Sequence, residues 1–378
     1  MYPPDLLGGE ILPITERKHG GNVYQVARQY GLDLEEIVDF SASVSPLGVP
    51  EAVMQAVKTS LETIMRYPDP ACQVFRQAAA LELGVESENI IAGNGAAELI
   101  YLIVRMLLPR RALLPVPTFS EYEHAVGSAG GRLRYVQLQP ENTHFVFPVD
   151  DFCKAIQGAD LAFICNPNNP TGTLLDKTAL QEILEAGKDN HCFIVVDEAY
   201  LDFVKDGSDY SLVKQVLEYD NLLIIKSLTK VYALPGLRIG YAIGNKALIR
   251  KMNNLRDPWS VNALAQAAGA AALQDGNYRT SLQEMVWEER EFLYEEIKKL
   301  PGLKPYLTTA NFILVDTSAT GFTVGYLQEN LARAGLLIRD CTSIKGLGPY
   351  YFRIAIRTRA ENARLIKALN ELLKKWEP

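Results

Sequence analysis

The stretch from Leu222 to Tyr241 reads LLIIKSLTKVYALPGLRIGY and begins with a short apolar run, Leu222–Ser227. Comparable runs occupy Ala112–Val116, Leu161–Cys165, Phe193–Asp197 and Ile239–Gly244. Short apolar runs rich in β-branched residues are typical of strands buried on both faces of a parallel sheet. Between them, stretches such as Lys177–Asp189 and Leu212–Tyr219 carry apolar residues at helical spacing. The alternation predicts an α/β sheet domain, mostly parallel and flanked by helices, from about residue 50 to about residue 260.

The C-terminal part follows a different pattern. It predicts helices over Trp287–Leu300 and Arg359–Trp376, a helix near Val324–Ala334, and strands at Phe312–Val315, Leu336–Arg339 and Tyr351–Ile356. The last helix would bury one face made of Leu365, Leu369, Leu372 and Trp376. We expect a smaller α+β domain over residues 266–378, a large domain over 49–265, and an N-terminal segment, 1–48, that joins the small domain.

Composition and charge exclude several classes of protein. The 378 residues are 48% hydrophobic and 22% charged, which is ordinary for a globular chain. A net charge of −7 does not favour nucleic acid or an anionic membrane as a partner. No apolar run approaches the roughly 18 residues of a membrane span, and residues 1–22 do not resemble a secretory signal. The five scattered cysteines indicate reduced thiols, so we expect a soluble, cytoplasmic enzyme.

Lys230 is the first candidate for chemistry, because it stands just beyond a predicted buried strand. In an interior the pKa of a lysine falls, and the neutral amine is a nucleophile that can form a Schiff base. Ser227 and Arg238 flank Lys230 at offsets of −3 and +8, and both could bind an anion. A loop with a solvated lysine and a surface arginine has the same spacing, so spacing alone leaves both interpretations open.

Three other segments carry polar residues at the ends of predicted strands. Asp197 could hold a protonated ring nitrogen at the edge where open α/β sheets bind ligands, or it could simply cap a turn. Asn166-Pro-Asn-Asn169-Pro-Thr-Gly172 is either a rigid turn or a ligand contact. Gly93-Asn-Gly95-Ala96-Ala97 opens the apolar helix Leu99–Leu108, where backbone N–H groups could approach a phosphate.

In this order the segments resemble the fold-type I pyridoxal-phosphate enzymes, in the class I/II aminotransferase family. The resemblance implies the transferase fold of that family and pyridoxal 5'-phosphate as cofactor, and it names no metal ligand. It implies that Lys230 carries the covalent link to the cofactor, Asp197 pairs with the ring nitrogen, and Asn169 and Tyr200 contact the ring hydroxyl. The remaining cofactor contacts would come from Gly95, Ala96, Ala97, Ser227 and Arg238 at the phosphate and from Phe119 on the ring face.

The same resemblance implies a homodimer with shared active sites. Tyr67, in Arg66-Tyr67-Pro68-Asp69, matches a tyrosine that this family lends to the phosphate site of the neighbouring subunit. Arg353, in Tyr-Phe-Arg353-Ile-Ala-Ile, would bind the substrate carboxylate as a bidentate fork.

Flanking motifs look like those of the threonine-phosphate decarboxylases of cobalamin biosynthesis, the relatives of histidinol-phosphate aminotransferases within this family. These motifs include His19-Gly-Gly-Asn22, Asp39-Phe-Ser-Ala and Leu337-Ile-Arg339-Asp-Cys. His19 and Arg339 would then contact the substrate phosphate, with Arg339 and Arg353 on adjacent strands. Ser43 and Ser45 depart from this pattern, because the decarboxylases typically have asparagine at both positions.

The expected reaction is therefore decarboxylation of L-threonine O-3-phosphate, a phosphorylated amino acid, to (R)-1-aminopropan-2-yl phosphate. An aminotransferase acting on histidinol phosphate or an aromatic amino acid is the alternative enzyme. A cofactor-binding regulator without turnover is disfavoured, because Lys230 is present and no basic helix-turn-helix pattern precedes the sheet domain.

Overall fold

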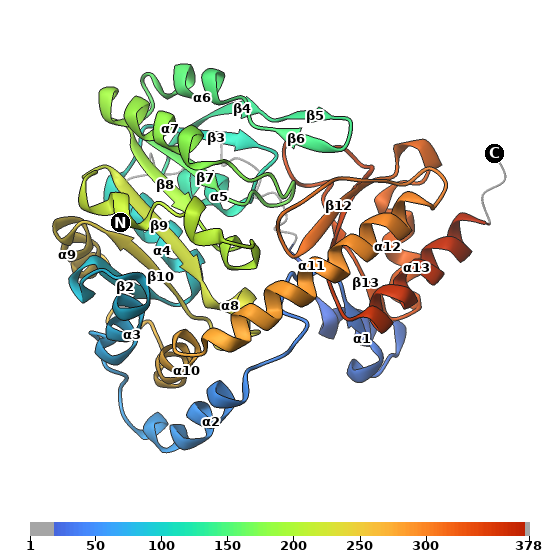
Figure 1. Ribbon diagram of the computed structural model, residues 1–378, viewed down its shortest axis with the longest axis horizontal. Coiled ribbons are helices and arrows are strands. Elements are labelled where there is room, and N and C mark those ends of the chain that lie inside the picture. The colour runs from blue at the N-terminus through green and yellow to red at the C-terminus, as the bar shows by residue number, and fades with distance from the viewer. Residues whose placement is uncertain (1–18, 375–378) are drawn as a thin grey trace, which may run out of the picture.

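The computed structural model of the chain describes residues 19–374 (Figure 1). Two expectations fall partly outside this range: residues 1–18 of the N-terminal segment, and Trp376 on the face of the last helix. Within residues 19–374, no helix combines the length and the hydropathy that a membrane span requires. All five cysteines are free thiols.

A seven-stranded sheet forms the larger part of the molecule. In spatial order its strands are β2 (Ile90–Gly93), β10 (Gly240–Gly244), β9 (Leu222–Ser227), β8 (Phe193–Asp197), β7 (Leu161–Cys165), β3 (Arg111–Val116) and β4 (Arg132–Gln137). Only β10 is antiparallel to its neighbours, and the other pairs are parallel. The predicted mostly parallel α/β sheet is confirmed, and the five predicted strands lie within one residue of their expected ranges.

Helices cover both faces of this sheet. Successive side chains along a strand point to opposite faces, so alternate residues contact the helices on opposite sides. Leu223 and Ile225 face the cluster of α4 (Gly95–Leu107), α5 (Glu121–Ser128) and α9 (Lys246–Leu255). Leu222 and Ile224 face the opposite cluster, to which α3 (Gln73–Leu83), α6 (Val149–Ile156), α7 (Lys177–Asp189) and α10 (Ala263–Leu273) contribute. Asp197 has the same parity on β8 as Val195, so its carboxylate faces α5.

The C-terminal part is a four-stranded antiparallel sheet with helices. Its strands are β11 (Lys304–Pro305), β12 (Phe312–Asp316), β15 (Tyr351–Ala355) and β14 (Arg339–Asp340), and its helices are α12 (Val324–Arg333) and α13 (Arg359–Leu373). The long helix α11 (Gly276–Lys298) runs from α10 to this sheet (Figure 1). The expected helix from Trp287 was too short, because α11 begins eleven residues earlier at Gly276. The buried face of α13 continues through Leu373, whereas Leu372 is only partly buried.

Two further sequence predictions were wrong in detail. The run Leu336–Arg339 is not one strand: β13 (Leu336–Leu337) pairs with β1 (Val38–Asp39), and β14 belongs to the four-stranded sheet. The stretch Leu212–Tyr219 forms only the short 3₁₀ helix η7 (Val213–Leu217). Polar side chains alternate along the edge strand β4, which explains why it has no apolar run.

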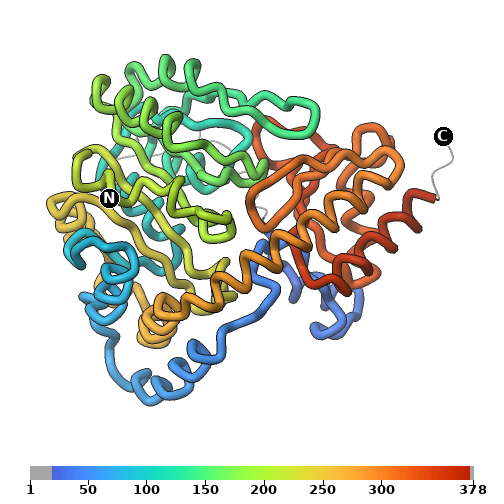
Figure 2. Tube along the Cα trace, viewed as in Figure 1, coloured from blue at the N-terminus to red at the C-terminus, as the bar shows by residue number. Residues whose placement is uncertain are grey.

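The N-terminal segment lies against the C-terminal part of the chain. β1 pairs in parallel with β13, and the amide of Phe40 donates to the Leu337 carbonyl over 2.8 Å. Figure 2 shows the blue start of the described chain, including α1 (Val23–Tyr30), beside its red end. This pairing supports the expected division into large domain, small domain and N-terminal segment, which stays a prediction.

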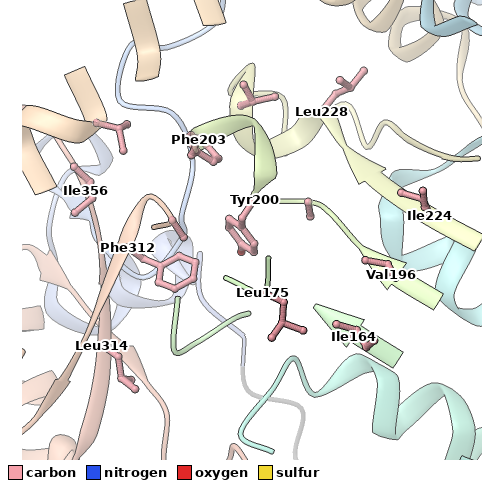
Figure 3. Packing of buried hydrophobic residues seen from close by; sticks show 14 of the residues in the cluster. Ile164, Leu175, Val196, Tyr200, Phe203, Ile224, Leu228, Phe312, Leu314 and Ile356 are labelled. Atoms are coloured by element: carbon pink, nitrogen blue, oxygen red, sulfur yellow. The ribbon is translucent and has the colours of Figure 1, made fainter. Parts of the chain in front are cut away.

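The hydrophobic core continues between the two sheets. Tyr200, in the loop after β8, meets Phe312 of β12 edge to face, with ring centroids 5.0 Å apart (Figure 3). The other helices and strands of the described residues are α2 (Glu51–Thr59), α8 (Leu228–Val231), the hairpin of β5 (Gln139–Glu141) and β6 (His144–Val146), and the 3₁₀ helices η2 (Leu34–Glu36), η3 (Leu61–Met65), η4 (Ser87–Asn89), η5 (Leu201–Phe203), η6 (Gly207–Tyr210) and η8 (Ser318–Thr320). Residues around Tyr200 are therefore fixed from both sides.

Candidate active site

The predicted residues converge on the carboxyl-terminal edge of the large sheet. Asp197 and Ser227 are the last residues of β8 and β9, Asn169 follows β7, Phe119 follows β3, and Gly95 follows β2. Because parallel strands end at the same edge, segments more than 100 residues apart in the sequence come together there.

A cavity of about 340 Å³ opens at this edge, between the loops of the large sheet and residues of the C-terminal part such as Arg339 and Arg353. Nine of the predicted residues line it: His19, Ala97, Phe119, Asn169, Tyr200, Lys230, Arg238, Arg339 and Arg353. Its wall also includes Gly20, Ser41, Ala42, Ser43, Ser120, Glu121 and Ile344. A larger open cleft of about 820 Å³ lies over α6 and α7, and none of the predicted residues lines it. The smaller cavity is therefore the candidate active site.

Lys230 has the properties of a nucleophilic amine. Removal from water lowers its pKa to about 8, and the nearby positive charges of Arg353 and Arg238 act in the same direction. Lys226, four residues earlier, is a useful contrast. Burial alone would lower the pKa of Lys226, but Asp202 and Glu198 more than offset that effect and raise it. Of these two lysines, Lys230 is therefore the better candidate for a nucleophile.

Asp197 is almost completely buried and is held by two hydrogen bonds. The hydroxyl of Tyr122 donates to Oδ2 over 2.7 Å, and the amide of Ala199 donates to Oδ1 over 2.9 Å. Burial raises the pKa of the Asp197 carboxyl, while both hydrogen bonds work against that increase. Asp197 does not line the cavity, but it is close enough to Lys230 to raise the pKa of that amine.

Tyr122 is a residue that the sequence did not suggest. Its ring is fully buried, stacks on Phe163 with centroids 4.7 Å apart, and meets Phe119 edge to face at 5.5 Å. It therefore supports both the carboxylate and the aromatic ring expected beside the cofactor. The available signal was a tyrosine on the apolar face of a helix, which is usually a core residue.

The start of α4 lies against Arg238. Gly95 has φ +76°, and a Cβ on it would lie 2.5 Å from Nη2 of Arg238, so only glycine allows this approach. The hydroxyls of Ser227 and Thr229 lie 2.8 Å apart, and both residues are buried. Backbone N–H groups at a helix start, two hydroxyls and a guanidinium are groups that could bind a phosphate.

Arg353 on β15 lies directly opposite Arg339 on β14. The prediction that these two arginines stand on adjacent strands is confirmed. Nη1 of Arg353 donates to Oδ1 of Asn169, Nη2 donates to the Ser41 carbonyl over 3.1 Å, and the guanidinium lies over the Phe312 ring. Both arginines are more than 90% buried. Within residues 19–374, neither of them nor Arg238 forms an ion pair with an acidic side chain. The cavity thus holds three guanidinium groups without carboxylate partners.

Ser43 and Ser45, the two departures from the expected pattern, occupy different environments. Ser43 lines the cavity, and its buried hydroxyl has no hydrogen-bond partner among the described residues. Ser45 does not line the cavity, and its hydroxyl lies 2.6 Å from that of Tyr278. Only Ser43 can influence a bound substrate directly.

Tyr67 is a predicted site residue that lies on the surface and does not line the cavity. Its side chain is 80% exposed and stacks on Trp259, with ring centroids 4.6 Å apart. Gly95, Ala96, Asp197 and Ser227 lie in the segments that build the cavity but do not line it.

Comparison with known proteins gives a consistent picture. The family model for aminotransferase class I and II matches residues 35–369. The chain is 35% identical to the threonine-phosphate decarboxylase of Salmonella typhimurium over 94% of its own length and 96% of that protein. It is 33% identical to the histidinol-phosphate aminotransferase of Methanothermobacter thermautotrophicus, with 94% of each chain covered. The crystal structure of the histidinol-phosphate aminotransferase from Clostridium acetobutylicum superposes with a TM-score of 0.83 at 29% identity, covering 89% of this chain and 99% of that one.

Proposed function

The chain belongs to the aminotransferase class I and II family of pyridoxal-phosphate enzymes, and from that membership we propose that it decarboxylates L-threonine O-3-phosphate to (R)-1-aminopropan-2-yl phosphate. The observation that carries the proposal is the set of three arginines that line one cavity, Arg238, Arg339 and Arg353, of which the last two are buried. Among residues 19–374, none of the three forms an ion pair with an acidic side chain. A cofactor phosphate, a substrate carboxylate and a substrate phosphate are three anions, and each would take one guanidinium.

The residues present suit pyridoxal phosphate. Arg238, which lies against Gly95 at the start of α4, and the hydroxyl of Ser227 would hold the cofactor phosphate. Phe119 would stack on the ring, Asp197 would face the ring nitrogen, and Asn169 and Tyr200 would contact the ring hydroxyl. When bound, the cofactor supplies an electron sink for the bond broken at the substrate Cα.

The chain's own groups would then direct the reaction. Lys230, with its lowered pKa, can accept and return a proton near pH 8. Arg353, fixed by Asn169, Ser41 and the Phe312 ring, would orient the substrate carboxylate. Arg339 and His19 would bind the substrate phosphate, which distinguishes this substrate from an unphosphorylated amino acid.

The homodimer with shared sites is also part of the proposal. Leu61, Ile64 and Met65 on η3, together with Tyr67 and Trp259, are large hydrophobic side chains that are between 46% and 80% exposed. Such a surface favours a protein partner, and a second copy of the chain would cover it and bring Tyr67 to the neighbouring cofactor phosphate. A cytoplasmic location remains a prediction.

Product identification tests the reaction. The pure protein, supplied with pyridoxal phosphate, is incubated with L-threonine O-3-phosphate and no amino acceptor. Continued release of carbon dioxide together with (R)-1-aminopropan-2-yl phosphate supports the proposal. No carbon dioxide, with a keto acid formed only when an amino acceptor is added, would instead assign an aminotransferase.

A further inference from the structure

Glu121 is the one acidic side chain among the cavity-lining residues in the part of the chain that the structure describes. It lies at the start of α5 and is only 7% exposed. Its Oε2 accepts a hydrogen bond of 2.7 Å from the hydroxyl of Tyr101, and its Oε1 lies 3.1 Å from Nε2 of His19. The carboxylate of Glu121, in a cavity lined by three arginines, thus lies next to the imidazole of His19.

The segment that carries His19 is fixed to the opposite wall of the cavity. Gly20 packs so closely on Ser41 that a Cβ would collide with the Ser41 carbonyl oxygen. The amide of Gly21 donates to the Ser41 hydroxyl over 2.7 Å, and the same Ser41 carbonyl accepts from Arg353. The two glycines therefore hold the His19 backbone next to the carboxylate-binding arginine, and the imidazole reaches across to Glu121.

The position beside Glu121 is the place where an imidazole-bearing substrate would find a partner. Such a substrate presents a phosphate, which the arginines attract, and an imidazole, which they repel when it is protonated. Among the described residues that line the cavity, Glu121 is the acidic acceptor for that ring, and Nε2 of His19 already lies 3.1 Å from its Oε1. A small substrate such as threonine phosphate has no ring to place there.

We infer that His19 and Glu121 form a specificity filter, in which the chain's own imidazole fills the position that a substrate imidazole would need and so selects against histidinol phosphate. The inference rests on the proposed function, because it assumes a substrate phosphate in the same cavity.

The test measures imidazole binding to His19→Ala by calorimetry on the cofactor-loaded protein. His19→Ala should bind free imidazole, and adding Glu121→Gln to it should weaken that binding at least tenfold. His144→Ala is the matched control, because His144 also faces a glutamate, Glu141 at 3.9 Å, but lies on the β5–β6 hairpin outside the cavity. His19→Gln, which keeps a hydrogen-bond donor at the site, should bind imidazole no better than the wild type.

Histidinol phosphate gives the second measurement. Its affinity for His19→Ala should exceed its affinity for the wild type at least tenfold, while the affinity for threonine phosphate does not rise. Equal imidazole binding by His19→Ala and His144→Ala, or equal histidinol phosphate binding by wild type and His19→Ala, would overturn the inference. Because binding needs no turnover, a failure here is separate from a failure of the decarboxylation assay.

Discussion

Replacing Arg339 by alanine should weaken binding of L-threonine O-3-phosphate far more than binding of L-threonine, because only the former carries the second anion. Arg339 is 8% exposed and lies opposite Arg353 in the β14–β15 pairing. A hydrogen bond to an ionised group contributes about 1.5–3 kcal/mol, and each 1.4 kcal/mol is about tenfold in affinity. The dissociation constant for threonine phosphate should therefore rise by about 10- to 150-fold.

The alanine variants of Arg339 and Arg353 should also differ in their free energy of unfolding. Burial lowers the pKa of the Arg339 guanidinium, and among residues 19–374 no acidic side chain pairs with it. A buried charge without a partner is costly, so Arg339→Ala should leave the free energy of unfolding of the ligand-free protein unchanged or higher. Arg353→Ala should lower it, since Asn169 and Ser41 lose a donor, and should weaken both ligands about equally.

Calorimetric titration of both ligands, with thermal unfolding of the ligand-free variants, measures these effects. Arg333→Ala is the control, because Arg333 lies on the exposed face of α12 and pairs with Glu329. It should change neither affinity. If Arg339→Ala weakened threonine phosphate and threonine to the same degree, the phosphate role of Arg339 would be wrong.

The remaining predictions concern the cofactor residues and the subunit interface. Raising the pH from 7 to 9 should speed uptake of pyridoxal phosphate by cofactor-free protein roughly tenfold, because the pKa of Lys230 is lowered to about 8 and only the neutral amine reacts; stopped-flow absorbance measures the rate, and a flat profile would contradict this. Asp197→Ala should reduce kcat/KM at least a hundredfold, since removing a charge-stabilising group costs about 3–4 kcal/mol; a loss below tenfold in steady-state assays counts against the role. Mixing inactive Lys230→Ala and Tyr67→Ala subunits should restore part of the activity, since one site of the mixed dimer is intact; no recovery after verified subunit exchange would argue for sites built within one chain.

The sequence predicted most reliably those strands that are buried on both faces. Leu161–Cys165, Phe193–Asp197 and Leu222–Ser227 have the bounds expected from their apolar runs, because a central strand needs apolar side chains in both directions. Edge and two-residue strands lack that pattern. The run from Leu336 to Arg339 is divided between two sheets, a tertiary arrangement that no local periodicity encodes.

Site residues that directly follow a strand were predictable from the sequence. Residues that contact the site from a distant part of the sequence were not. Lys230, Asn169 and Arg238 belong to local motifs and line the cavity. Tyr122 meets Asp197 across 75 positions of sequence, so nothing near Asp197 indicates it. Glu121 was missed for the same reason, because its partner His19 comes from the N-terminal segment.

Borohydride reduction of the cofactor-loaded protein, followed by peptide mass spectrometry, identifies the lysine that binds pyridoxal phosphate. If the cavity at the sheet edge is the cofactor site, that lysine is Lys230. Lys226 is the internal control, since it lies four residues away and its pKa is raised by Asp202 and Glu198 despite its burial. The reduced cofactor should be found on Lys230 alone. Cofactor fixed to Lys226 or to another lysine, or no fixed cofactor at all, would contradict it.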